Sequence, residues 1–192
     1  LGVGSIRFGQ AAINQRQVTQ LAHRYMQGLM QRTQESVSLV LYTAEQAICV
    51  QNVRPERSLW VSPTRVGSQV ALHCSASGKV YLASFRPETS DDLIGKLDLT
   101  AKTPFTITDP DRLRREVAET RRRGYGIDWQ EMDLELVCIA APVVDVSGKA
   151  VAALSLSGVR SRIEEFGVER TIAEVRGAAA ALSTALGGPT PV

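Results

Sequence analysis

Small and hydroxyl-bearing side chains fill the start of the segment HCSASGKVYLAS, which spans residues 73–84. The run from Ser75 to Gly78 stands where a loop gives way to a short apolar stretch with helical spacing. The first N–H groups of a helix lack partners within the helix and carry partial positive charge, so small residues let a carboxylate approach them. Ala76, Ser77 and Gly78 therefore form a candidate anion site, although tight packing of the helix on a sheet explains them equally well. Lys79 could pair with such a carboxylate or point to solvent.

A second pair of hydroxyls lies two residues apart, at Ser155 and Ser157, in an apolar run with the character of a strand. Alternate residues of a strand face the same side, so both hydroxyls share one face, and Leu154 and Leu156 share the other. Buried hydroxyls need hydrogen-bond partners. A ligand carboxylate, a neighbouring helix or an ordered water could provide them.

Catalytic chemistry has little support in the sequence. A hydrolytic triad needs a serine or cysteine beside a histidine and an acid, and the chain has two histidines. His23 falls within a long predicted helix, and Cys74 directly follows His73, so these neighbours point apart on an extended chain. No C-x-x-C or H-E-x-x-H spacing indicates zinc, although a metal held by His73, Cys138 and Asp128 stays open. We expect no enzyme, no cofactor and no structural metal.

Composition sets the class of protein. The 192 residues are 44% hydrophobic and 22% charged, with a net charge of +2, so the chain can bury a core and has no global field that favours nucleic acid. Arginines between residues 112 and 123 alternate with acids, which is typical of an exposed charged helix. Three cysteines without paired spacing fit a reducing compartment. No apolar run reaches membrane-spanning length, and we expect a cytoplasmic protein with no membrane partner.

Hydrophobic spacing predicts the elements that position these residues. Apolar residues at steps of three and four between residues 10 and 34 predict a long amphipathic first helix. Alternation over residues 36–53 predicts two strands, and a weaker third strand spans residues 58–62. Short helices are expected from Ala76 to near Pro87 and from Asp91 to Leu97.

The second half of the chain carries stronger signals. Asp109 before Pro110 predicts a helix start, because Asp is a good N-cap and Pro suits the first helical position. Gly124 predicts its left-handed end. Two long strands follow within residues 136–158, joined by a hairpin turn at residues 146–149, and an alanine-rich helix runs from about Arg162 to Leu186. This order predicts an α+β domain, with helices packed on an antiparallel sheet.

Four segments together resemble the effector-binding domain of the IclR family of bacterial transcriptional regulators. They are LHCSASGKVYLA (residues 72–83), RRRGYGID (121–128), CIAAPVVDVSGKAVAALSLSG (138–158) and the alanine helix that ends in LGG. The leading LGVGSIRFGQ resembles the segment that follows the family's DNA-binding head. The resemblance covers almost the whole chain, in order and at consistent spacing.

The resemblance implies a GAF-like domain, in which an antiparallel sheet of about six strands lies between helices and a pocket takes a small organic acid. Residues 1–34 would be a linker segment with the first helix, residues 35–188 the effector-binding domain and residues 189–192 a tail. The family's winged helix-turn-helix binds operator DNA. Only one long helix precedes the sheet here, so we expect DNA contact only through that missing head. Homodimers or homotetramers are also implied.

The resemblance further assigns site residues. Ala76 and Ser77 match ligand contacts at the helix start, and Asp128 and Cys138 match two further pocket positions. Asp128 could accept a hydrogen bond from a ligand or cap the turn after Gly126. Cys138 could equally be a small buried hydrophobe.

An apolar wall is implied at Leu59, Ser62 and Val70 by their register with the family. One position departs from the family pattern, because Glu135 stands where a glycine is usual. An acidic side chain there would repel a carboxylate if it faced the pocket, and would have no such effect if it pointed to solvent.

We therefore expect a domain that senses a small organic acid and oligomerises within an IclR-type regulator. Two alternatives stay open. One is a GAF-like module whose pocket is filled by side chains and which acts only in oligomerisation. The other is a small enzyme that uses Cys138 or Cys74.

Overall fold

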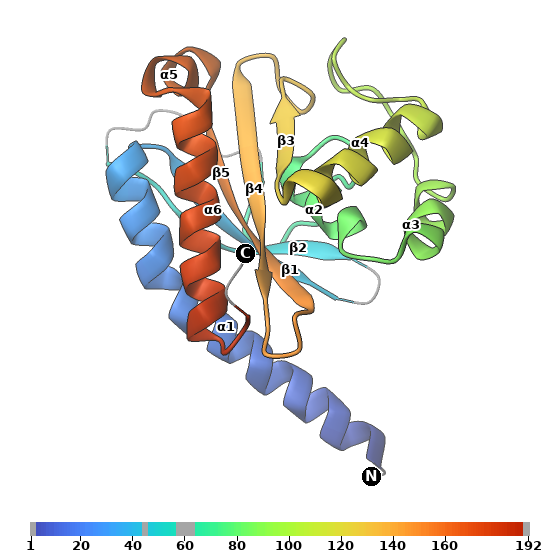
Figure 1. Ribbon diagram of the computed structural model, residues 1–192, viewed down its shortest axis with the longest axis vertical. Helices are drawn as coiled ribbons and strands as arrows, with labels where there is room; N and C mark the ends of the chain where they lie inside the picture. The colour runs from blue at the N-terminus through green and yellow to red at the C-terminus, as the bar shows by residue number, and fades with distance from the viewer. Residues whose placement is uncertain (1–2, 44–45, 57–63, 190–192) are drawn as a thin grey trace.

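A five-stranded antiparallel sheet lies between two layers of helices in the computed structural model, which describes residues 3–43, 46–56 and 64–189 (Figure 1). Helices α1 (Val3–Thr33) and α6 (Val168–Ala185) cover one face of the sheet. On the other face lie α2 (Ala76–Ala83), α3 (Pro87–Ile94) and α4 (Pro110–Arg123). The layered α+β architecture agrees with the arrangement that the order of elements predicted.

The strands are β1 (Ser36–Tyr42), β2 (Ala47–Val53), β3 (Gly126–Trp129), β4 (Leu136–Val144) and β5 (Ala150–Val159). Their order across the sheet is β2-β1-β5-β4-β3, and every pairing is antiparallel. About six strands were expected, and five lie within the described ranges. The weak strand predicted over residues 58–62 falls outside those ranges, whereas the short edge strand β3 was not predicted.

Side-chain alternation in β5 divides the interior into two parts. Leu154 and Leu156 face the core that α1 and α6 cover, as their spacing predicted. Ser155 and Ser157 face the opposite side, toward α2. The sheet therefore separates an apolar core from a more polar interior, and it is the second of these that holds the candidate site.

The ends of α4 follow the predicted capping chemistry. The Asp109 carboxylate accepts a hydrogen bond from the Arg112 amide at 2.7 Å, and Pro110 occupies the first helical position. Gly124 ends the helix with φ = 77°, in the left-handed region that glycine adopts without strain.

Two other helices differ from the prediction. Pro87 begins α3 instead of ending the preceding helix, because proline lacks only an N–H that the first helical turn does not use. The alanine-rich segment is not one helix. It divides at Gly167, with φ = 99°, into α5 (Arg160–Phe166) and α6.

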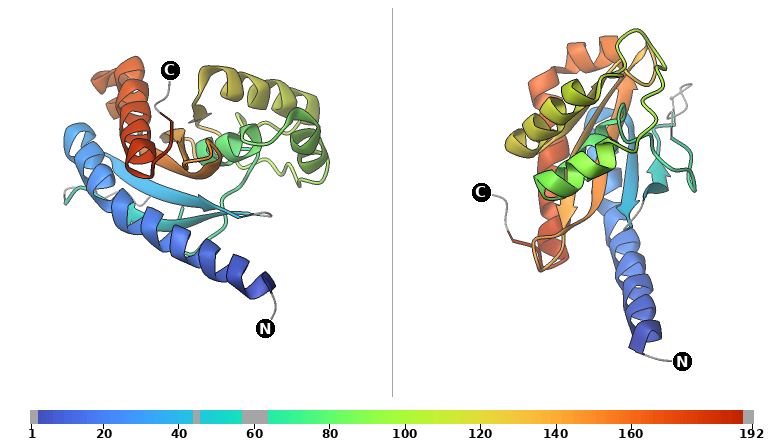
Figure 2. Two further views of the ribbon diagram at one scale, coloured as in Figure 1. Left: turned by 60° about the horizontal axis from the view of Figure 1, so that its bottom comes forward. Right: turned by 90° about the vertical axis from the view of Figure 1, so that its right-hand side faces the viewer.

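The long helix α1 begins at Val3, and its N-terminal part extends away from the body of the molecule (Figure 2). Toward its other end, Ala22, Met26 and Leu29 are fully buried at steps of four and three residues. This stripe packs against the sheet and α6. Among the described ranges, no helix is long and apolar enough to cross a membrane.

Candidate functional site

A small cavity of about 10 Å³ lies between the start of α2 and the polar face of the sheet. It brings together six of the ten residues that the sequence nominated, from segments far apart in the chain. Its described lining is Ser38, Val40, Thr64, Ser75, Ala76, Ser77, Asp128, Met132, Cys138, Ser155 and Ser157.

Strand register builds the floor of the cavity. Asp128 on β3 pairs with Cys138 on β4, and Cys138 pairs with Ser157 on β5. Residues directly opposite on neighbouring strands lie about 4.5–5.5 Å apart at Cβ, so the three side chains form a continuous row. Ser155 lies one pleat along β5, opposite Ser38 of β1.

The start of α2 forms the opposite wall. Ser75 is the N-cap: its hydroxyl accepts a hydrogen bond from the Gly78 amide at 3.0 Å and donates one to the Ala71 carbonyl at 2.6 Å. Within the described part of the chain, no hydrogen bond engages the amides of Ala76 and Ser77. These two N–H groups stand at the positive end of the helix, where an anion is favoured.

Gly78 does not line the cavity. A Cβ at this position would lie 2.6 Å from both the Ala71 carbonyl oxygen and the Leu72 Cα, closer than atoms in proteins approach. Glycine is therefore required here by tight packing of α2 on the preceding loop, and not on a sheet as the packing alternative had it.

The Asp128 carboxylate combines the two roles that the sequence left open. Its Oδ1 accepts hydrogen bonds from the amides of Glu131 at 2.7 Å and Met132 at 3.2 Å, which caps the turn after β3. Its Oδ2 is buried without a hydrogen-bond partner among the described residues. Burial raises the pKa of Asp128 to about 7. Below that pH, the carboxyl carries a proton that Oδ2 can donate into the cavity.

The cysteines are poorly suited to act as nucleophiles. Burial raises the pKa of Cys138 well above its ordinary value and that of Cys74 to about 12, so both thiols stay protonated near neutral pH. The Nε2 of His73 lies 3.0 Å from the Thr100 carbonyl. No group of three potential ligands in the described residues is placed to hold a metal ion, His73, Cys138 and Asp128 included.

The remaining predicted residues lie elsewhere. Val70 is buried in a second core cluster and borders a separate hollow beside His73, away from the cavity. Leu59 and Ser62 fall outside the described residues. Glu135 is exposed to solvent, so its charge does not face the cavity.

Sequence reasoning missed several lining residues, of which Ser38 and Met132 are the clearest. Ser38 alternates with apolar residues of β1 in the way that Ser155 does in β5, and the same periodicity could have identified it. Met132 follows β3 in an irregular turn with no periodic signal. The Met132 sulfur accepts a hydrogen bond from the Cys74 thiol at 3.1 Å.

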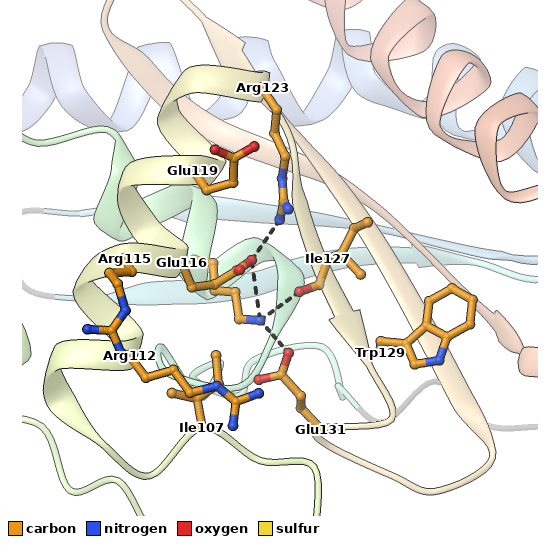
Figure 3. A pocket seen from close by; sticks show the side chains of 10 residues that line it. Ile107, Arg112, Arg115, Glu116, Glu119, Arg123, Ile127, Trp129 and Glu131 are labelled. Carbon is orange, nitrogen blue, oxygen red and sulfur yellow. Dashed lines mark hydrogen bonds and ion pairs between the residues drawn. The ribbon is translucent and has the colours of Figure 1, made fainter.

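A larger hollow of about 430 Å³ lies on the outer side of α2, between α4 and β3 (Figure 3). Lys79 lines this hollow and not the small cavity, and it does not point to solvent, because its side chain is 1% exposed. Its Nζ donates to the Ile127 carbonyl at 2.8 Å and pairs with Glu131. Glu116 pairs with Arg123 at 2.7 Å. The Glu116 and Glu131 side chains already have cationic partners. Among the described residues, Oδ2 of Asp128 and the two amides of α2 have no hydrogen-bond partner, so the smaller cavity is the better candidate.

Comparison with known proteins agrees with this architecture. The family model described as "Bacterial transcriptional regulator IclR C-terminal" matches residues 10–184. The transcriptional repressor AllR of Klebsiella pneumoniae is 34% identical over 190 residues, which are 97% of this chain and 68% of that protein. The repressor IclR of Escherichia coli K12 is 30% identical, over 98% of this chain and 69% of that protein.

Solved structures give the same result. The Thermotoga maritima IclR structure superposes with a TM-score of 0.81 at 32% identity, over 97% of this chain and 75% of that one. An IclR homologue from Microbacterium hydrocarbonoxydans, solved with 4-hydroxybenzoate, gives 0.79 at 28% identity, over 88% of this chain and 68% of that one. These proteins are regulators and not enzymes. The chain belongs to the IclR family of bacterial transcriptional regulators and corresponds to the C-terminal, effector-binding domain of its members.

Proposed function

We propose that this domain senses a small organic acid in the cavity between α2 and the sheet. The observation that supports it is that the row Asp128, Cys138 and Ser157 faces two amides at the start of α2 that have no hydrogen-bond partner in the described residues. A carboxylate would accept hydrogen bonds from the amides of Ala76 and Ser77. The hydroxyls of Ser155 and Ser157 and the protonated Asp128 would hold a second polar group of the acid.

The size of the cavity bears on how the acid enters. About 10 Å³ is roughly the room that one water molecule needs, whereas pockets for small-molecule ligands commonly measure about 300–1,000 Å³. The acid would therefore bind a more open arrangement, in which the unbranched Met132 side chain changes rotamer. Binding to one arrangement over the other is what allows a ligand to change the activity of a regulator.

The Microbacterium neighbour supports the class of ligand, since it was solved with an aromatic hydroxy acid. The full regulator would act as a cytoplasmic homodimer or homotetramer, with residues 35–188 as the sensing unit and residues 1–34 as the link toward a DNA-binding head. Light scattering of the purified chain would measure its oligomeric state.

Thermal-shift measurements with a panel of keto acids and aromatic hydroxy acids test the proposal. A ligand that binds only the folded state raises Tm by mass action, by an amount that grows with its concentration. The Ser157→Ala variant should show a much smaller shift at the same ligand concentration, and Ser161→Ala, at an exposed serine on α5, should keep the full shift. Equal shifts in both variants would place the ligand elsewhere.

The small volume also favours a second function, that of a ligand-free module which acts only through oligomerisation. In that case no acid in the panel raises Tm, and Met132→Ala, which enlarges the cavity, still binds none. The enzyme alternative has no comparable support, because both candidate thiols are protonated.

A further inference from the structure

The end of β3 and the turn that joins it to β4 carry two cavity residues, Asp128 and Met132, and are held from outside the cavity. Lys79 of α2 donates from Nζ to the Ile127 carbonyl at 2.8 Å and forms an ion pair with the Glu131 carboxylate. Neither Lys79 nor Glu131 lines the cavity. Both residues instead line the larger hollow between α4 and β3, where Figure 3 labels Glu131.

Other contacts to this turn leave it little freedom. The Thr103 hydroxyl donates to the Gln130 carbonyl at 2.6 Å, and the Thr106 hydroxyl donates to the Glu131 carbonyl at 2.6 Å. The Glu131 amide in turn donates to Asp128 Oδ1. The backbone of Glu131 is therefore held at its carbonyl by Thr106 and at its amide by Asp128.

The ion pair also connects the two walls of the cavity. Lys79 lies one turn after Ala76 on α2, and Glu131 lies three residues after Asp128. The side chains of the pair are only 1% and 9% exposed. Attraction between two charges rarely repays the desolvation of both, and neutral replacements of similar size are often as stable. Stability alone therefore does not explain why a charged pair stands here.

We propose that Lys79 and Glu131 are positioning residues, which fix the separation between the α2 amides and Asp128 and thereby set the affinity for the effector. The inference rests on the proposed effector site. The pair also contacts Glu116 of α4, 3.7 Å from Lys79 Nζ, so displacement of the turn on binding would reach α4.

Replacing Lys79 and Glu131 by neutral residues of similar size separates their effect on ligand affinity from their effect on stability. Lys79→Met alone leaves the Glu131 carboxylate buried without a cation and should lower Tm. The double variant Lys79→Met/Glu131→Gln should recover most of this loss, yet bind 4-hydroxybenzoate at least tenfold more weakly than the wild type by calorimetry. Ile172→Val, in the core on the opposite face, serves as the control: it should lower Tm without changing affinity. Wild-type affinity in the double variant would overturn the proposal.

Amide hydrogen exchange provides a measurement that needs no ligand. The amides of Glu131 and Met132 donate to Asp128, so they should exchange at least tenfold faster in the double variant, while those of α6 stay unchanged. If the wild type binds no acid, the proposed effector site fails and exchange alone decides the role of the pair. Unchanged exchange at both amides would show that the pair does not position the turn.

Discussion

At the scale of single residues, Asp128 has the most unusual environment. Two backbone amides occupy Oδ1, which leaves the proton to Oδ2, and burial raises the pKa to about 7. A neutral carboxylic acid can donate a hydrogen bond to a ligand carboxylate, whereas the ionised form repels it. The protonation state of one side chain therefore determines whether the cavity favours an anion.

Binding should depend on pH through this carboxyl. For an acid that is ionised throughout the range, the wild-type Kd should rise about tenfold per pH unit above pH 7, because Asp128 must then be protonated for binding. Asp128→Asn keeps a donor and has no charge, so its Kd should change little with pH. Calorimetric titrations between pH 6 and 8.5 would measure both, and a flat profile in the wild type would contradict the assignment.

Stability should change with pH for the same reason. The pKa of Asp128 is raised from 3.8 in the unfolded chain, so the folded state binds more protons between about pH 4 and pH 7. The contribution of Asp128 to stability is fully present below pH 4 and is lost as pH rises through 7, by on the order of 4 kcal/mol. Urea unfolding across this pH range would measure the free energy of unfolding of the wild type and of Asp128→Asn. The difference between the two free energies should become smaller toward low pH.

At the scale of elements, the cavity depends on how closely β3 approaches the start of α2. A Cβ at Gly126 would lie 2.4 Å from the Ala76 carbonyl oxygen, so only glycine lets the strand pass beneath the helix. Ser75 caps the same helix end and directs its amides toward the sheet. The position of α2 therefore follows from one missing side chain and one hydroxyl.

Gly126→Ala should separate α2 from β3 and destabilise the domain by about 1–3 kcal/mol, as overpacking does. Effector binding should be lost with it. Gly177→Ala is the matched control, since nothing lies within 4 Å of a Cβ on this exposed position of α6. It should raise stability by about 0.5–1 kcal/mol through helix propensity. Chemical denaturation measures both, and an unaffected Gly126→Ala would argue against the close packing.

At the scale of the whole molecule, the sheet lies between the large apolar core and the proposed effector site. The buried core on the face toward α1 and α6 is apolar, and the face toward α2 carries the cavity serines and Asp128. Adjacent residues of β5 therefore belong to different environments. Leu156 is fully buried in the core, and Ser157 lies in the cavity wall.

Alanine substitution of Leu156 should affect mainly stability, whereas alanine substitution of Ser157 should affect mainly effector binding. Leu156→Ala should cost about 2–5 kcal/mol of stability through lost burial and the resulting void, and should leave the Kd of the effector within a factor of two. Ser157→Ala should change stability much less and weaken effector binding about tenfold or more. Denaturation and calorimetry on the two variants measure this separation. Equal losses of affinity would mean that the two faces are not independent.

Much of the local structure could be predicted from the sequence. The caps of α4, the hairpin between β4 and β5 and the opposite facing of Leu154 and Ser155 all follow from residue preferences and strand periodicity, which act over a few residues. The resemblance of four segments to the IclR family led to the correct fold class and family. It also nominated six residues that the fold brings to one cavity.

The size of the cavity, the inward burial of Lys79 and the divided role of Asp128 were decided only by tertiary structure. Lys79 meets Glu131 across 52 positions of sequence, and no periodic pattern within α2 specifies that contact. Val70 lies away from the cavity because packing of the loop before α2 fixes its place. Sequence patterns determine which way a side chain faces on its own element, whereas the distance to its partners depends on how separate elements pack.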